Sequence, residues 1–152
     1  MSSRMYMMIG APGVGKSYYI EQHKNPGTLV ISRDKIRFNM LKDEDEYFSK
    51  EKEVYDEFIR QINAAIERGE TFYVDQTSLN RASRNKLFSR LKIKPTYTTA
   101  IYLKSSLDKI LYQNSLRSGR ALVPEDAVIN MFNSIEEPKL EEGFDEIWTI
   151  EK

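Results

Sequence analysis

The chain is organised around Gly10-Ala11-Pro12-Gly13-Val14-Gly15-Lys16-Ser17, which fits the phosphate-binding loop pattern GxxxxGK[ST] at every fixed position. Glycines let such a loop form a cradle whose amides point at phosphates, and the following helix adds the positive end of its dipole. Lys16 can reach the β- and γ-phosphates, and the Ser17 hydroxyl is an oxygen ligand of the kind that Mg²⁺ prefers. An ordinary glycine-rich turn is the alternative. The context argues against it, because residues 4–9 read as a buried strand and residues 16–22 can open a helix.

Composition narrows the class of protein. The 152 residues, 40% of them hydrophobic, suit a single domain over 1–152 with its own core. Lysine plus arginine equals aspartate plus glutamate at 23 each, so any basic site must be local. The absence of cysteine excludes disulfides and thiolate metal sites. No apolar run approaches the roughly 18 residues that span a bilayer, so we expect no membrane contact and a soluble, cytoplasmic protein.

Strand and helix patterns alternate with short connections, which indicates an α/β domain with a parallel sheet. The clearest helix is 49–68, where apolar residues recur every three to four positions and Gly69 ends the pattern. The acidic stretches 43–46 and 136–146 are interpreted as solvated surface. The predicted strands are 4–9, 28–31, 71–74, 97–103 and 146–150, and the predicted helices are 16–22, 33–41, 49–68, 80–91, 105–116 and 124–135.

A parallel sheet binds ligands beyond the carboxyl ends of its strands, and the second strand is followed there by Asp34 and Arg37. Asp34 could accept the proton of an acceptor hydroxyl while Arg37 grips an anionic substrate, as phosphoryl transfer requires. The alternative is a charged first helical turn in which Asp34 only favours the helix dipole.

Two further places at this edge carry candidate chemistry. Asp75, with Gln76 and Thr77 after it, could hold a magnesium-bound water or orient an arginine, or it could be a turn residue bonded to its own backbone. Arg117 and Arg120 follow a predicted helix at a point where the chain must bend. They could fold over a nucleotide and meet the charge of the transferred phosphoryl group, or simply favour the helix dipole.

Taken together, these motifs resemble the kinase domain of the phage polynucleotide kinase family, and more loosely the kinase module of the animal polynucleotide kinase phosphatases. The resemblance covers nearly the whole chain. It rests on Ile9 to Ser17, on Ile31-Ser32-Arg33-Asp34 with Arg37, on Val74 to Asn80, and on Asn114-Ser115 with Arg117 and then Val123-Pro124. It implies a P-loop kinase fold whose five parallel strands lie in the order 2-3-1-4-5, with an arginine-bearing lid.

The resemblance also implies an activity, the transfer of the γ-phosphate of ATP to a 5′-hydroxyl of DNA or RNA with Mg²⁺, in a host cytoplasm if the gene is a phage gene. Catalysis would fall to Lys16, to Asp34 as general base and to Arg117 in the lid. The expected ATP-binding residues are Gly10 to Ser17, Tyr18, Arg117 and Arg120, with Ser17 holding the metal. The expected acceptor-binding residues are Asp34, Arg37, Asp75, Gln76 and Thr77.

Some positions depart from the family pattern. Tyr18 replaces the usual threonine, and Gln113 replaces an earlier lid arginine. Gln76 aligns with the phage aspartate, whereas Asp75 agrees with the animal pattern and is the one we expect in the site. The phage enzyme carries a separate phosphatase domain, and at this length we expect only its kinase half here.

Other classes remain open. A guanine-reading switch would need an NKxD-type motif, which is absent, and a motor ATPase would have glutamate where Gln76 stands. The closer rival is a small-molecule kinase of the same fold or a toxin that phosphorylates a sugar nucleotide. For a nucleic-acid acceptor, zero net charge predicts a short footprint in which a 3′-phosphorylated nucleoside suffices. The alternative is a groove along the basic helix that carries Arg81, Arg84, Lys86 and Arg90.

Overall fold

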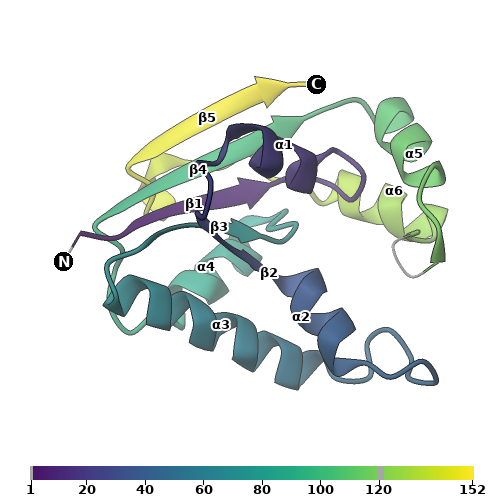
Figure 1. The fold of residues 1–152 in the computed structure, drawn as a ribbon. Coiled ribbons are helices and arrows are strands. Elements are labelled where there is room, and N and C mark those ends of the chain that lie inside the picture. The colour runs from purple at the N-terminus through teal and green to yellow at the C-terminus, as the bar shows by residue number, and fades with distance from the viewer. Residues whose placement is uncertain (1, 120–121) are drawn as a thin grey trace.

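The computed structural model describes residues 2–119 and 122–152 (Figure 1). Its strands are β1 (Arg4–Ile9), β2 (Leu29–Ser32), β3 (Thr71–Asp75), β4 (Tyr97–Lys104) and β5 (Glu146–Glu151). Its helices are α1 (Lys16–His23), α2 (Arg33–Met40), α3 (Glu51–Glu67), α4 (Arg81–Ser89), α5 (Leu107–Ser115), α6 (Glu125–Asn133) and the short 3₁₀-helix η2 (Leu140–Glu142). Each predicted strand and helix is present, with ends that differ by at most two residues.

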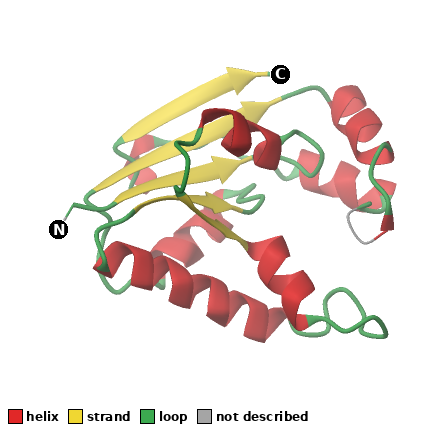
Figure 2. Cartoon of the chain, viewed as in Figure 1, coloured by secondary structure: helices red, strands yellow, loops and turns green. Residues whose placement is uncertain are grey.

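The five strands form one sheet in the order β2-β3-β1-β4-β5, and all four neighbouring pairs are parallel. This confirms the expected fold class and strand order. Figures 1 and 2 show α3 and α4 on one face of the sheet and α1 on the other, while α2, α5 and α6 lie beyond the carboxyl ends of the strands. Loops at that edge therefore surround the phosphate-binding loop.

Helices on both faces explain why β1 is apolar almost throughout. Met5, Met7 and Ile9 point into a core cluster under α3, whereas Met8 points into a second cluster with the α1 residue Ile20. Such a strand, buried on both sides, holds the loop that follows it in a fixed position.

Helix starts follow the capping chemistry of the sequence. The side chains of Ser32, Asn80 and Ser106 each accept a hydrogen bond from the backbone amide three residues ahead, at the starts of α2, α4 and α5. The Ser32 cap fixes the point at which the chain leaves β2 and begins α2, and so places the first turn of α2 at the carboxyl edge of the sheet.

The interpretation of residues 136–146 as solvated surface is wrong for Glu142. Its side chain is 4% exposed and pairs with the fully buried Arg84 of α4, whose Nε lies 2.7 Å from Glu142 Oε1. Arg84 also donates from Nη1 to the carbonyl of Ser78 at 2.9 Å. A buried arginine needs a partner of opposite charge. Because Arg84 points into the protein interior, Glu142 is buried beside it as its partner.

Candidate functional site

The phosphate-binding loop has the backbone that its glycines predict. Gly13 and Gly15 have φ of 87° and 100°, in the left-handed region that favours glycine. A Cβ on Gly13 would lie 3.0 Å from the carbonyl oxygen of Ile110, so the loop packs closely against α5. The amide of Gly10 donates to the carbonyl of Thr77 at 3.0 Å, which ties the start of the loop to the segment after β3.

Lys16 folds back across this loop. Its Nζ donates to the carbonyls of Gly10 at 3.0 Å and Ala11 at 3.1 Å. Burial lowers the pKa of Lys16 to about 8, against the charges of Asp75 and Asp34 that raise it, and the charge of Arg117 lowers it further. Three predicted site residues from separate parts of the chain therefore act electrostatically on Lys16.

Beside Lys16, the Ser17 hydroxyl donates to Asp75 Oδ2 at 2.8 Å. Ser32 pairs with Asp75 in the β2–β3 register, so both strand ends lie at the same level of the edge. A hydroxyl and a carboxylate in contact are hard oxygen donors that fit a nucleotide-bound Mg²⁺, which keeps most of its waters. Among residues 2–119 and 122–152, no cluster of three acidic or histidine side chains could hold a metal by itself.

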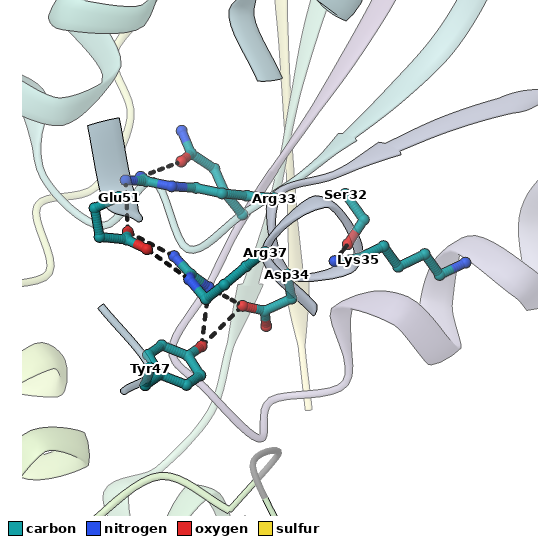
Figure 3. A network of polar contacts seen from close by, with 8 residues as sticks. Ser32, Arg33, Asp34, Lys35, Arg37, Tyr47 and Glu51 are labelled. Carbon is teal, nitrogen blue, oxygen red and sulfur yellow. Dashed lines mark hydrogen bonds and ion pairs between the residues drawn. The ribbon is translucent and has the colours of Figure 1, made fainter. Parts of the chain in front are cut away.

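Asp34 lies at the start of α2 in a network of polar contacts (Figure 3). Its Oδ1 accepts hydrogen bonds from Arg37 Nη1 and from the hydroxyl of Tyr47, the latter at 2.9 Å. Its Oδ2 has no hydrogen-bond partner within the described part of the chain, and the side chain is 59% exposed. One carboxylate oxygen is thus fixed and the other is open, which is the arrangement that a general base needs.

Arg37 is held more tightly than the sequence indicated. Its side chain is only 6% exposed, and it forms a bidentate pair with Glu51 of α3, Nε to Oε2 at 2.7 Å and Nη2 to Oε1 at 2.8 Å. Arg37 Nη1 also donates to Tyr47 at 2.9 Å. An acceptor phosphate that binds here would share the guanidinium with two carboxylates, so the expected phosphate-binding role stays a prediction.

Sequence reasoning missed Tyr47 and Glu51. Tyr47 directly follows the acidic stretch 43–46, which is interpreted above as solvated surface, and Glu51 lies in the predicted helix 49–68, where its charge is given no role. The signal available was a carboxylate at the amino end of α3 together with two arginines of α2, Arg33 in its first turn and Arg37 in its last. Because α2 and α3 pack together, Glu51 accepts bonds from both.

The remaining predicted acceptor residues have structural contacts. Gln76 Oε1 accepts a hydrogen bond from Arg33 Nη1 at 3.1 Å, which links the end of β3 to α2. Thr77 contributes its carbonyl to the start of the phosphate-binding loop. Asp75 contacts Ser17, the predicted metal residue, and so lies nearer to the expected donor than to Tyr47 and Arg37.

The segment between α5 and α6 carries the predicted lid arginines. Asn114 closes its base, because its side-chain amide bonds both the carbonyl of Val123 at 2.7 Å and the amide of Val123 at 3.1 Å. Arg117 is exposed within this segment and its charge acts on Lys16, whereas Arg120 lies outside the described residues. The lid itself therefore stays a prediction.

A cavity of about 660 Å³ lies between the phosphate-binding loop and α5. Tyr18 and Tyr112 line it, and both rings are mostly exposed. Asp108, Gln113 and Lys152 add polar groups. Aromatic walls with a few polar groups suit a flat heterocycle, and the cavity adjoins the loop expected to bind its phosphates.

Helix α4 does not offer a row of unpaired cations. Arg81 pairs with Glu141 at 2.9 Å and Arg84 with Glu142, and Arg90, directly after the helix, pairs with Asp56 at 3.1 Å. Lys86 Nζ lies over the Tyr55 ring, 4.6 Å from its centre. These ion pairs reduce the positive field that a long nucleic-acid groove would need.

No helix within residues 2–119 and 122–152 is both long enough and apolar enough to cross a bilayer.

Known proteins resemble this chain in sequence or in fold. The L-seryl-tRNA(Sec) kinase of Methanococcus maripaludis is 28% identical over 152 residues, a match that covers 93% of this chain and 56% of that protein, so the chain spans little more than half its length. The Pnkp1/Rnl/Hen1 RNA repair complex contains a chain with a TM-score of 0.69 at 14% identity, covering 88% of this chain and 44% of that chain. A sugar kinase from Janibacter sp. HTCC2649 gives a TM-score of 0.66 at 14% identity, covering 99% of this chain and 86% of that chain.

The two structural likenesses support the fold alone, and with the strand order they identify it as a P-loop kinase fold. Residues 5–138 match the family described as AAA domain. The matched range includes the phosphate-binding loop, Asp34, Asp75 and Arg117. Since the match spans most of the chain, the protein belongs to the AAA domain family.

Proposed function

We propose that this protein is an ATP-dependent kinase that phosphorylates the 5′-hydroxyl of a polynucleotide or of a 3′-phosphorylated nucleoside. The observation that carries the proposal is the carboxylate of Asp34, which has one oxygen held by Arg37 and Tyr47 and one open oxygen, at the sheet edge that carries the phosphate-binding loop. A donor site and a candidate base at one sheet edge are the minimum set for phosphoryl transfer.

ATP, the phosphoryl donor, would bind at the phosphate-binding loop, in the cavity beside it and at the Ser17–Asp75 pair. ATP phosphates would replace the carbonyl contacts of Lys16, and the adenine would enter the cavity beside Tyr18 and Tyr112. Ser17 and Asp75 would hold Mg²⁺, directly or through water, and the ion would supply charge neutralisation at the phosphates.

At the acceptor half, Asp34 Oδ2 would take the hydroxyl proton while the hydroxyl oxygen bonds to the γ-phosphorus. The bond from that phosphorus to the β,γ-bridging oxygen breaks, and ADP leaves with the electron pair. Arg117 would meet the charge of the transferred group, and Arg120 would assist it.

Support for a nucleic-acid acceptor comes from the likeness to the RNA repair complex and from the relative that acts on seryl-tRNA. Zero net charge and the paired arginines of α4 favour a short footprint. The second candidate is a small-molecule kinase, which the fold likeness to a sugar kinase supports.

An acceptor panel tests the proposal. Transfer of labelled γ-phosphate should be measured to 5′-hydroxyl DNA and RNA, to a 3′-phosphorylated nucleoside, to a bare nucleoside and to simple sugars. We expect the strands and the 3′-phosphorylated nucleoside to be phosphorylated at similar kcat/KM, with a shallow salt dependence, and the bare nucleoside to be poor. Transfer to sugars with none to 5′-hydroxyl ends would refute the proposed function. Activity that rises with strand length would instead favour the alternative in which the substrate binds along a groove at α4.

A further inference from the structure

Three aromatic side chains of the described residues are more than 60% exposed: Tyr18 at 66%, Phe48 at 65% and Tyr112 at 62%. Single exposed apolar residues are common and by themselves mean little. Tyr18 and Tyr112, however, line the cavity at the phosphate-binding loop. Phe48 lies in the connection between α2 and α3, on the side of Asp34.

Phe48 is placed relative to Asp34 by its neighbour. The Tyr47 hydroxyl donates a hydrogen bond to Asp34 and accepts one from Arg37, and these two bonds fix the position of the Tyr47 ring. The ring of Phe48 meets the ring of Tyr47 edge-on, with centroids 4.5 Å apart and planes at 78°. The Cζ of Arg37 lies 5.7 Å from the centre of the Phe48 ring. One guanidinium therefore separates this ring from the candidate base.

The connection is ordered without help from Phe48. Lys50 pairs with Asp45 at 3.4 Å and donates to the carbonyl of Met40 at 3.1 Å, which closes the connection on itself. The Phe48 ring has no part in either core cluster of the described residues. The connection thus presents an exposed aromatic ring beside the acceptor position and is held by contacts that a stacking partner does not have to supply.

We propose that Phe48 is a stacking platform for the nucleobase of the nucleoside whose 5′-hydroxyl is phosphorylated. The inference rests on the proposed function and names the part of the substrate that the chain reads. In a nucleoside one ribose separates the 5′-hydroxyl from the base, and here one guanidinium lies between Asp34 and Phe48. Bases of any identity have a π-face, so the contact is tolerant of sequence.

The charge of the connection favours a base over a phosphate at this place. Glu44 and Glu46 are exposed acids on either side of Asp45, close in sequence to Phe48. They would repel a nucleic-acid backbone but not an uncharged base. A simple sugar has no π-face to stack, and a sugar acceptor would therefore gain less from Phe48.

The test compares two 5′-hydroxyl strands that differ only in their first residue, an adenosine or an abasic tetrahydrofuran unit. For the wild type we expect kcat/KM to be roughly tenfold lower with the abasic strand, mainly through KM, the fold-change that the loss of one stacked base produces. Phe48→Ala should reduce the adenosine strand to the abasic level and leave the abasic strand and KM for ATP unchanged. Phe48→Trp should retain the preference.

Ile93→Ala is the matched control, because Ile93 is 60% exposed in the connection between α4 and β4. Melting temperatures of all variants should equal that of the wild type, since each altered side chain is mostly exposed. Equal use of the two strands by the wild type, or an equal loss on both in Phe48→Ala, overturns the base platform alone. Absence of transfer to either strand overturns the proposed function and the platform with it.

Discussion

The pair between Arg37 and Glu51 offers a sharp test of how the candidate base is held. In Glu51→Gln the side chain keeps its shape but loses its charge. The carboxylate accepts three guanidinium N–H bonds, two from Arg37 and one from Arg33 at 3.2 Å. The amide can accept on one oxygen only and turns an NH₂ group toward a donor. Arg37 therefore keeps Asp34 but loses one of its two hydrogen bonds to residue 51 and the opposite charge there.

The expected cost follows from burial. Breaking a fully buried ion pair by removing one charge costs about 3–5 kcal/mol. Glu51 is 27% exposed, so water reaches it, and we expect the free energy of unfolding to fall by about 2–3 kcal/mol. For a chain of this length the melting temperature should drop by roughly 5–10 °C.

Urea unfolding and thermal melting measure this change, and Glu44→Gln, at an exposed acid of the same connection, is the control. Turnover should also fall several-fold because Asp34 is held less well, while KM for ATP should stay near the wild-type value, since Glu51 does not contact the phosphate-binding loop. A loss below about 1 kcal/mol, or no more than the control shows, would mean that the pair does not hold Arg37 in place.

The same pair has a pH signature. The hydrogen bond from Arg37 holds the pKa of Glu51 below its usual value, against burial, and the charge of Arg33 adds to it. A depressed pKa stabilises the fold above the unfolded value of about 4.3 and loses that contribution as the pH falls through the folded value. The stability difference between wild type and Glu51→Gln should therefore be full at neutral pH and shrink below about pH 4. A difference that stays constant down to pH 3 would contradict this assignment.

Three further changes follow from the contacts. Gly13→Ala should weaken ATP binding by roughly tenfold or more, because a Cβ there meets the α5 backbone at 3.0 Å, whereas Gly27→Ala, with the same sign of φ but open space, should cost only the backbone strain of about 1–2 kcal/mol; equal effects on ATP affinity would contradict this. Arg84→Met should lower the free energy of unfolding by about 3–5 kcal/mol in a urea titration because it leaves the Glu142 carboxylate without its guanidinium partner, with the amide of Lys139 as its remaining hydrogen-bond donor among the described residues, and a loss below 1 kcal/mol would show that water replaces the pair. Lys16→Ala should abolish transfer and keep the melting temperature, and turnover within about tenfold of wild type, about 1.4 kcal/mol, would refute its role at the phosphates.

Local chemistry made much of the fold predictable. The glycines of the phosphate-binding loop, the caps at Ser32 and Asn80, and the buried stripe of α3 are set by short-range sterics, hydrogen bonding and periodicity, which a sequence displays directly. The strand order came from the resemblance, since no local pattern determines which strands are neighbours.

The missed features depend on pairs far apart in sequence. Arg84 and Glu142 are 58 residues apart, and each was interpreted by its own surroundings as a surface charge. Arg37 and Glu51 meet only because α2 and α3 pack together, and Tyr47 reaches Asp34 only through the path of the connecting loop. Such pairing depends on the tertiary structure. Because of it, Arg37, the expected phosphate ligand, also holds the candidate base Asp34.

The central claim, that Asp34 is the base of a phosphoryl transfer, is tested most directly by single-turnover transfer from ATP to a 5′-hydroxyl strand in Asp34→Asn. The amide keeps the shape and can still accept from Arg37 and Tyr47, but it cannot take the proton. The transfer rate should fall by roughly 10²-fold or more while the Kd for ATP changes little. A rate near that of the wild type, or a loss of ATP binding equal to the loss of rate, would contradict the account.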